Sequence, residues 1–293
     1  LVYFAIFHEN INNGISVTGS HNPGDYNGFK ISLQKKSLFG AEIQDLRRRI
    51  ENKHFKISAQ QGTLSVFDVT KAYQQFILQS IVLSKPLHIV VDAGNGTAGP
   101  IAPSLFRKLG CQVTELFCDM DGTFPNHFPD PTVPENLQAL IRQVRETNAH
   151  LGIAFDGDAD RIGVVDQTGR VLWGDELMII FSREILKESP GASIIAEVKC
   201  SSNLFSDIRR QGGKPIMWKT GHSLIKSKLA EEKALLAGEM SGHMFFADHY
   251  YGFDDAIYAA CRLLKILSNT SKSLSDLLSD IPKKFATPEI RIE

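Results

Sequence analysis

Residues 151–165 read LGIAFDGDADRIGVV, a short acidic loop between two apolar runs. Both runs contain β-branched residues and no helical periodicity, so they predict buried strands. Between them Asp156, Asp158 and Asp160 stand at alternate positions, and Arg161 follows. In an extended loop the three carboxylates can face one point, where a hard divalent cation would offset their mutual repulsion. The stretch therefore predicts a metal-binding loop between two strands.

Two other interpretations of the acidic loop are weaker. The calcium loop of an EF-hand needs Gly at its sixth position and Glu at its twelfth. Here those positions hold Arg161 and Gln167. A solvated Asp-Gly turn in a hairpin would explain two aspartates, but neither the third aspartate nor the arginine. Divalent metal binding is therefore the preferred prediction.

The composition argues against several classes of partner. The chain has 293 residues, which at about 100–200 residues per domain predicts two or three domains. Its formal net charge of −1 gives no footprint for nucleic acid or an anionic membrane. No apolar run approaches the ~20 residues that cross a bilayer. The scattered cysteines form no C-x-x-C pair and predict reduced thiols in a cytoplasmic protein: Cys111, Cys118, Cys200 and Cys261.

The first 70 residues are predicted to form one domain, and because the chain does not begin with Met we expect it to start inside that domain. The opening run Leu1–Phe7 is apolar without a basic segment before it, which predicts a buried strand and not a signal peptide. A turn at residues 19–24 exposes Ser20. Ser20 is a candidate nucleophile, and the alternative is an ordinary turn. His21, as the next residue, is expected to point away from Ser20, which argues against a Ser-His hydrolase pair.

The rest of the chain repeats a strand, helix, glycine, strand order. Residues 105–110 and 204–212 are faintly alike, which indicates two similar α/β units in tandem. The predicted domains are residues 1–70, 71–172 and 173–284, with 285–293 as a linker. Strands are expected at 15–17, 29–31, 88–91, 112–117, 151–155, 162–165, 193–198, 214–219 and 234–237, and helices at 41–50, 71–82, 101–109, 135–147, 175–187, 202–211, 223–231, 254–267 and 274–279.

A glycine pattern offers a competing function. Gly94, Gly96 and Gly99 match G-x-G-x-x-G after a predicted strand, and Glu115 follows where a ribose-binding acid could lie. A lone glycine pattern of this kind matches many strand-to-helix turns. Dinucleotide binding is therefore the minor alternative.

Four loops together indicate phosphoryl transfer. Each is expected to follow a strand of an α/β unit, the end at which such folds gather ligands. Phosphoryl transfer needs a nucleophile or phosphate carrier, cations that neutralise the phosphate oxygens, and an acid and base for the hydroxyl proton. The loops offer a hydroxyl (Ser20), a cation site with Arg161, a cationic loop (Lys219, His222) and a polar loop (Glu239, Ser241, His243).

These loops resemble those of the α-D-phosphohexomutase superfamily, most closely its bacterial phosphomannomutase/phosphoglucomutase members. TGSHNP at 18–23 resembles the phosphoserine loop, DGDADR at 156–161 the metal loop, and GEMSGH at 238–243 the sugar-specificity loop. NGFK at 27–30 and KTGH at 219–222 match in order and spacing. The resemblance implies tandem similar α/β domains with mixed sheets around a central cleft. The family has four domains, so here the first is expected to lack its N-terminal part and the fourth to be absent.

The resemblance also implies a reaction, the interconversion of hexose 1-phosphate and hexose 6-phosphate of mannose or glucose by an isomerase. Ser20 would carry a phosphoryl group, and a hexose 1,6-bisphosphate would be the intermediate. Mg²⁺ would be held by Asp156, Asp158, Asp160 and the phosphate on Ser20. Arg161 would pair with the same phosphate in a charge-assisted contact. Glucose 1,6-bisphosphate would serve as activator.

Further residues receive roles from the resemblance. Lys30 and His243 are the candidates for general base and acid. Glu239 and Ser241 would hold the sugar hydroxyls, and three more residues would position sugar or phosphate: Lys219, Gly221 and His222. The partner is expected to be a small phosphosugar, with no nucleic acid and no membrane, and the protein is expected to be a cytoplasmic monomer. Phosphoglucosamine mutase and a non-catalytic sugar-phosphate-binding protein are the alternatives.

Overall fold

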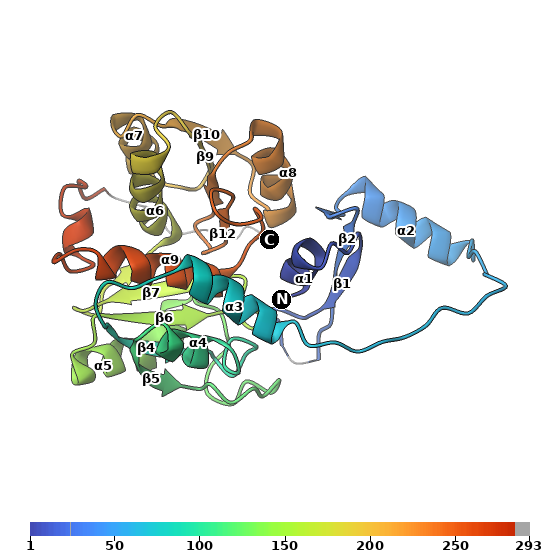
Figure 1. Cartoon of the computed structure of the whole chain (residues 1–293), viewed down its shortest axis with the longest axis horizontal. Helices are drawn as coiled ribbons and strands as arrows, with labels where there is room; N and C mark the ends of the chain where they lie inside the picture. Colours follow the sequence, from blue (N-terminus) through green and yellow to red (C-terminus); the bar gives the residue numbers. More distant parts are fainter. Residues whose placement is uncertain (24, 285–293) are drawn as a thin grey trace, which may run out of the picture.

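The computed structural model describes residues 1–23 and 25–284, which form three sheets with their helices. Figure 1 places a five-stranded sheet (green) and a four-stranded sheet (yellow to orange) one above the other, with a small blue sheet beside them. Both larger sheets combine parallel and antiparallel strands. The predicted α/β class with mixed sheets is therefore confirmed.

The five-stranded sheet has the order β5-β4-β6-β7-β8. Every residue of β6 and β7 is buried, which is why residues 151–165 show no alternation of polar and apolar side chains. β4 (His88–Asp92) is parallel to β5 (Gln112–Leu116) and β6 (Leu151–Phe155), while β7 (Ile162–Asp166) and β8 (Val171–Leu172) continue antiparallel. Its helices are α3 (Thr70–Ser80), α4 (Ala102–Lys108), the 3₁₀ turn η1 (Pro134–Leu137) and α5 (Gln138–Thr147).

The four-stranded sheet has the order β10-β9-β11-β12. β9 (Ser193–Glu197) lies between β10 (Lys214–Trp218) and β11 (Leu236–Gly238), and both are parallel to it. The carboxyl ends of these three strands therefore meet at one edge of the sheet. β12 (Met244–Phe246) returns antiparallel to β11. The helices of this unit are α6 (Gly174–Glu188), α7 (Ser202–Arg210), α8 (His222–Glu232) and α9 (Ala256–Ser268).

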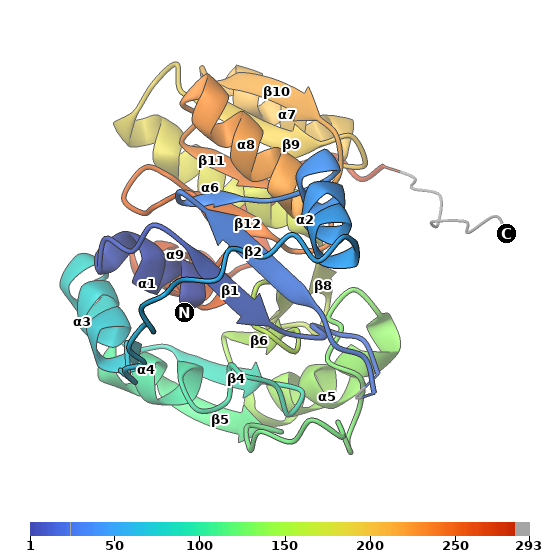
Figure 2. The ribbon, with the colours of Figure 1, turned by 90° about the vertical axis from the view of Figure 1, so that its right-hand side faces the viewer.

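The small antiparallel sheet has the order β1-β2-β3 and carries the N-terminal loops. Its strands are β1 (Gly14–Val17), β2 (Phe29–Leu33) and β3 (Lys36–Ser37), followed by α2 (Ala41–Glu51). Figure 1 shows α2 set apart from the two larger units. Figure 1 shows β1 and β2 to the side of those units, and Figure 2, seen from that side, shows them crossing in front of both.

The opening segment was predicted as a strand, and that prediction was wrong: Val2–His8 is helix α1. A short apolar run cannot be assigned to helix or strand by periodicity alone. Here aromatic partners from several elements surround the run. The Phe4 ring packs edge-on against Tyr73 of α3, while the Phe7 ring stacks on Tyr251. A helix directs side chains to all sides and so meets these partners, whereas a strand offers only two faces.

Smaller differences lie at element ends. The helix predicted at 274–279 is a single 3₁₀ turn, η2 (Asp276–Leu278), because Ser273 Oγ donates a hydrogen bond to Asp276 Oδ2 in a local turn that competes with the helix. The short strands β3, β8 and β12 were not predicted. The predicted linker at 285–293 lies outside the described residues.

One continuous hydrophobic core joins the two larger units. α9 packs against β7 of one sheet and against α6 and β12 of the other. The buried cluster includes Phe106 and Phe155 on one side and Phe181 and Phe246 on the other. Because both units share this core, their strand ends hold a fixed relation. Within the described residues, no helix is long and apolar enough to span a membrane.

Candidate active site

The acidic loop at residues 156–161 joins β6 to β7 and is folded by its first carboxylate. Asp156 Oδ1 accepts hydrogen bonds from the backbone amides of Asp160 and Arg161, both at 3.0 Å. One oxygen of each of Asp156, Asp158 and Asp160 lies within 4.8 Å of the others. Asp160 Oδ1 is buried without a hydrogen-bond partner among the described residues. This oxygen-only donor set fits Mg²⁺ or Ca²⁺.

The clustered negative charges of the acidic loop favour the binding of a cation. Asp156 is fully buried. Burial, and then the neighbouring Asp160 and Asp158, hold the pKa of Asp156 well above its ordinary value. A buried carboxylate with this pKa is short of positive charge in its surroundings. A divalent ion would supply that charge.

Ser20 lies in the loop between β1 and β2, and its side chain contacts the acidic loop. Its Oγ lies 3.0 Å from Asp156 Oδ2 and 3.1 Å from Asp158 Oδ1. The two backbones approach so closely that a Cβ built on Gly157 would lie 2.1 Å from the Ser20 carbonyl oxygen. Only glycine fits at position 157. The predicted nucleophile and the predicted metal ligands are thus brought together.

His21 does not point away from Ser20 as predicted. Its Nδ1 lies 3.1 Å from Ser20 Oγ. Ser20 has a φ of +52°, the left-handed conformation, so the alternation expected of consecutive side chains in extended backbone does not apply. Burial, and then Arg161, lower the pKa of His21, so its neutral ring can accept the serine proton. The serine hydroxyl has one proton and three neighbours that can accept it.

Lys30 extends from β2 into the acidic loop. Its Nζ lies 2.6 Å from Asp158 Oδ2 and 2.5 Å from Asp160 Oδ2. Although burial opposes the charged form, Asp160 and Asp158 raise the pKa of Lys30 above its ordinary value. Lys30 is therefore a charged proton donor here, and it compensates two of the three carboxylates.

His243 joins the acidic loop to the loop at 238–243, the predicted sugar-specificity loop. Its Nε2 accepts a hydrogen bond from Arg161 Nε at 3.1 Å. The carboxylates Asp160 and Asp254 outweigh burial and raise the pKa of His243 to about 9. The contact with Arg161 acts the other way, because it requires a free lone pair on Nε2. While that contact holds, the ring carries its single proton on Nδ1, which faces Asp254 Oδ2 at 3.2 Å.

The two predicted sugar loops meet each other directly. Glu239 is buried, and its Oε1 accepts a hydrogen bond from the Gly221 amide at 2.6 Å. Burial raises the pKa of Glu239. The His222 ring stacks on His243 with a centroid distance of 5.6 Å. Lys219 is exposed and Ser241 half-buried, and no hydrogen bond links either side chain to the other described site residues.

Two residues of the site, the buried Asp254 and the partly buried Lys226, were missed in the sequence. Asp254 lies beneath both histidines, 3.2 Å from His243 Nδ1 and 3.5 Å from His222 Nδ1. Lys226 of α8 lies 3.0 Å from Asp254 Oδ1 and donates to Tyr3 Oη at 3.1 Å. The pair Asp254-Asp255 before α9 was the available signal, since it could have suggested more than a helix cap.

The glycine pattern of the dinucleotide alternative has a packing explanation. A Cβ on Gly96 would lie 2.8 Å from the Gly157 carbonyl oxygen, and one on Gly99 would lie 1.9 Å from that of Cys118. The Thr97 amide donates to the Gly157 oxygen at 2.9 Å. The glycines therefore let this loop support the acidic loop.

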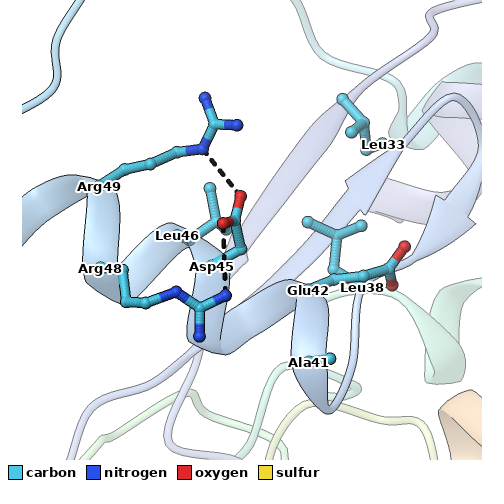
Figure 3. A pocket seen from close by; sticks show the side chains of 8 residues that line it. All are labelled: Leu33, Leu38, Ala41, Glu42, Asp45, Leu46, Arg48 and Arg49. Carbon is cyan, nitrogen blue, oxygen red and sulfur yellow. Dashed lines mark hydrogen bonds and ion pairs between the residues drawn. The ribbon is translucent and has the colours of Figure 1, made fainter.

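A surface groove lies elsewhere. It is bounded by α2 and the edge of the small sheet, and Figure 3 shows Asp45 between two arginines there. Its lining contains none of the predicted site residues: Leu33, Leu38, Ala41, Glu42, Asp45, Leu46, Arg48 and Arg49.

Comparisons with known proteins agree with this arrangement. Three successive family models match, described as phosphoglucomutase/phosphomannomutase alpha/beta/alpha domains I, II and III, over residues 1–60, 70–169 and 173–285. A phosphomannomutase/phosphoglucomutase of Pseudomonas aeruginosa is 50% identical over 279 residues, which is 95% of this chain and 60% of the relative. A phosphoglucomutase of Neisseria gonorrhoeae is 46% identical over 292 residues, covering 100% of this chain and 63% of the relative.

Solved structures lead to the same family. A phosphoglucomutase/phosphomannomutase family protein from Burkholderia thailandensis superposes with a TM-score of 0.92 at 50% identity, over 95% of this chain and 60% of that one. The chain thus spans about three-fifths of the length of the relatives it matches. It belongs to the phosphoglucomutase/phosphomannomutase family of the α-D-phosphohexomutase superfamily. The resemblance predicted from the loops is confirmed.

Proposed function

We propose that this chain carries the phosphoserine, metal and sugar sites of a phosphohexomutase, an isomerase that interconverts hexose 1-phosphate and hexose 6-phosphate. Mannose and glucose phosphates are the proposed substrates, and a hexose 1,6-bisphosphate is the proposed intermediate. The observation that carries the proposal is the position of Ser20 Oγ, 3.0 and 3.1 Å from two carboxylates of the acidic loop. The names of the relatives support the same reaction.

In the proposed reaction a phosphoryl group on Ser20 passes to a free hydroxyl of the sugar. The bond between phosphorus and Ser20 Oγ breaks as the bond to the sugar oxygen forms, and the hydroxyl proton leaves to a base. Asp156, Asp158 and Asp160 would hold Mg²⁺, which when bound would neutralise charge on the phosphate. The reverse transfer, after the bisphosphate turns round, returns the other phosphate to Ser20.

The proton-transfer roles follow from the contacts of two side chains. Lys30 is ion-paired with two carboxylates and is therefore protonated, and it is the proposed general acid. His243 has an Nε2 lone pair that Arg161 occupies in this state. A phosphate that attracts Arg161 would expose this lone pair, and His243 could then accept the hydroxyl proton. Arg161 would at the same time pair with the phosphate.

The sugar would be held by the loops at the carboxyl ends of β10 and β11. Glu239 and Ser241 are the proposed acceptors for sugar hydroxyls, and Lys219, Gly221 and His222 would position sugar or phosphate. Glucose 1,6-bisphosphate is the proposed activator because it would rephosphorylate Ser20. A cytoplasmic location and a monomeric state remain predictions.

The test is to incubate the protein with glucose 1,6-bisphosphate and MgCl₂ and to map phosphopeptides by mass spectrometry. We expect one phosphate on Ser20, which then discharges onto glucose 1-phosphate or mannose 1-phosphate. Ser20→Ala is the matched control and should carry no phosphate. A folded protein that never acquires phosphate on Ser20 would instead be a sugar-phosphate-binding protein without turnover.

A further inference from the structure

Glu197 is a buried carboxylate that the proposed reaction does not use. It is the last residue of β9, the strand between β10 and β11, and it is 0% exposed. Its strand neighbours are followed by the two sugar loops, at 219–222 and 238–243. Because all three strands are parallel, the Glu197 side chain lies at the edge where both loops begin.

Each oxygen of Glu197 holds one of these loops. Oε2 accepts a hydrogen bond from Thr220 Oγ1 at 2.5 Å. Oε1 accepts one from the Met240 amide at 2.6 Å. The Gly221 amide in turn donates to Glu239 Oε1. Two carboxylates and two loops thus form a closed ring of hydrogen bonds, and Lys199 Nζ, 3.9 Å from Glu197 Oε2, is a nearby cation.

We propose that Glu197 is a positioning residue that sets the distance between the two sugar loops, acting through Thr220 and Met240. The inference rests on the proposed function, because it assumes that these loops hold the sugar. Glu197 is fully buried with both oxygens engaged, so it acts on the sugar only through the loops. Hydrogen bonds to a charged acceptor are stronger than neutral ones, which suits the carboxylate to fix two otherwise separate loops.

The first test changes Thr220, which is exposed and whose replacement leaves the core intact. Thr220→Val removes the hydroxyl at nearly constant volume, and Thr220→Ser keeps the hydroxyl as matched control. Titration calorimetry with glucose 1-phosphate is the measurement. We expect Thr220→Val to bind about 10-fold more weakly, the loss of one charge-assisted hydrogen bond. Thr220→Ser should remain within about 2-fold of the parent.

The second test changes Glu197 itself. Glu197→Gln can still accept from the Met240 amide and can donate to Thr220 Oγ1 if the hydroxyl reverses, whereas Glu197→Met can do neither. We expect the glutamine variant to bind within about 3-fold of the parent and the methionine variant at least about 10-fold more weakly. Urea unfolding of both variants separates this effect from a loss of fold. Thr220→Val decides the matter if Glu197→Met does not fold.

Steady-state kinetics give a measurement that a merely structural role would not move in the same way. In Thr220→Val we expect KM for hexose 1-phosphate to rise by about 10-fold while kcat changes by less than about 3-fold, since the loops hold ground state and transition state alike. Hydrogen exchange of the Met240 and Gly221 amides should become faster in the same variant. Thr220→Ser should restore both.

The outcomes separate this inference from the proposed function. If the parent protein binds no glucose 1-phosphate, the proposed function fails and the inference falls with it. If the parent binds but Thr220→Val binds equally well, the inference alone is overturned. The same holds if Thr220→Ser is as weak as Thr220→Val, since the hydroxyl would then not be the determinant. Weak binding of the valine variant with recovery in serine supports the proposal.

Discussion

Asp254 and Asp255 are consecutive buried carboxylates in opposite surroundings. Asp255 accepts hydrogen bonds from Tyr73 Oη at 2.9 Å, Tyr250 Oη at 2.7 Å and the Tyr258 amide at 2.9 Å. All three donors are neutral, and together they fasten α3 of one large unit to the start of α9 in the other. We call this cluster of Asp255, Tyr73, Tyr250 and Tyr258 the joint, because its hydrogen bonds hold the two units together.

The neighbouring Asp254 faces the site and meets charge instead. Lys226 lies 3.0 Å from Oδ1, while His243 and His222 lie 3.2 and 3.5 Å from Oδ2. Burial favours the neutral form of Asp254, but Lys226 and His243 outweigh it and hold the pKa of Asp254 well below its ordinary value. Oδ2 has no hydrogen bond of good geometry within the described part of the chain. Neutral, fully paired donors therefore mark a joint, whereas titratable and incompletely paired partners mark a place where ligands act.

The largest expected effect is on the joint. Asp255→Ala leaves two buried tyrosine hydroxyls and the first turn of α9 without an acceptor. We expect the free energy of unfolding to fall by ~3–5 kcal/mol, the sum of several unpaired buried donors. Urea unfolding followed by circular dichroism measures it. Asp255→Asn, which keeps one acceptor oxygen, should lose about half as much free energy of unfolding. A loss below ~1 kcal/mol in Asp255→Ala would mean that these hydrogen bonds do not stabilise the fold.

The residues around Asp254 should make the stability of the fold depend on pH. Burial lowers the pKa of His222 from its ordinary 6.5 to about 4. Between these values the unfolded chain binds more protons than the folded one, so stability should rise with pH from 4 to 6.5 and level off above. Because the ring is about one-third exposed, we expect only ~1–2 kcal/mol across this window.

Unfolding of the parent and of His222→Gln, measured at a series of pH values, checks this expectation. The stability of the parent should rise relative to that of His222→Gln as the pH rises through the window. The two tyrosines bound to Asp255 contribute no such slope, because burial and the neighbouring Asp255 hold the pKa values of Tyr73 and Tyr250 well above their ordinary value. If the difference in stability stays constant with pH, the surroundings of Asp254 contribute no pH dependence, and the electrostatic contrast with Asp255 is wrong.

The same contrast explains what the sequence could predict. The acidic loop was found because its three carboxylates and arginine lie within six consecutive residues, and its strands because β6 and β7 are apolar throughout. Asp254 and Glu197 were missed because each gains its role from partners on other strands and helices. No local pattern separates a carboxylate that caps a helix from one that orients a histidine. Long-range pairing decides that.

Two wrong predictions have local physical causes. His21 was expected to point away from Ser20, but a left-handed backbone at Ser20 cannot be read from a Gly-Ser-His-Asn sequence. Leu1–Phe7 was expected as a strand because a seven-residue apolar run suits both elements, and the aromatic partners of α1 lie far along the chain.

The smallest expected effect is a gain in stability, whereas Asp255→Ala is expected to lose stability. The pKa of Asp156 is held well above its ordinary value by burial and by Asp160 and Asp158, so its charge destabilises the fold without a cation. Asp156→Asn keeps an oxygen for the Asp160 and Arg161 amides but removes that charge. We expect the metal-free variant to be about 1 kcal/mol more stable than the parent.

The variant should lose the rise in stability that MgCl₂ gives the parent, because a ligand stabilises only the state that binds it. Asp166→Asn is a matched control at the far end of the same hairpin. Asp166 Oδ1 accepts from the amides of Thr168 and Arg170 and has no part in the acidic loop. The control should be less stable than the parent and keep the response to Mg²⁺. If Asp156→Asn is less stable than the parent and keeps the response to Mg²⁺, the acidic loop only stabilises the fold, as the Asp255 cluster does. The two clusters would then not differ in role.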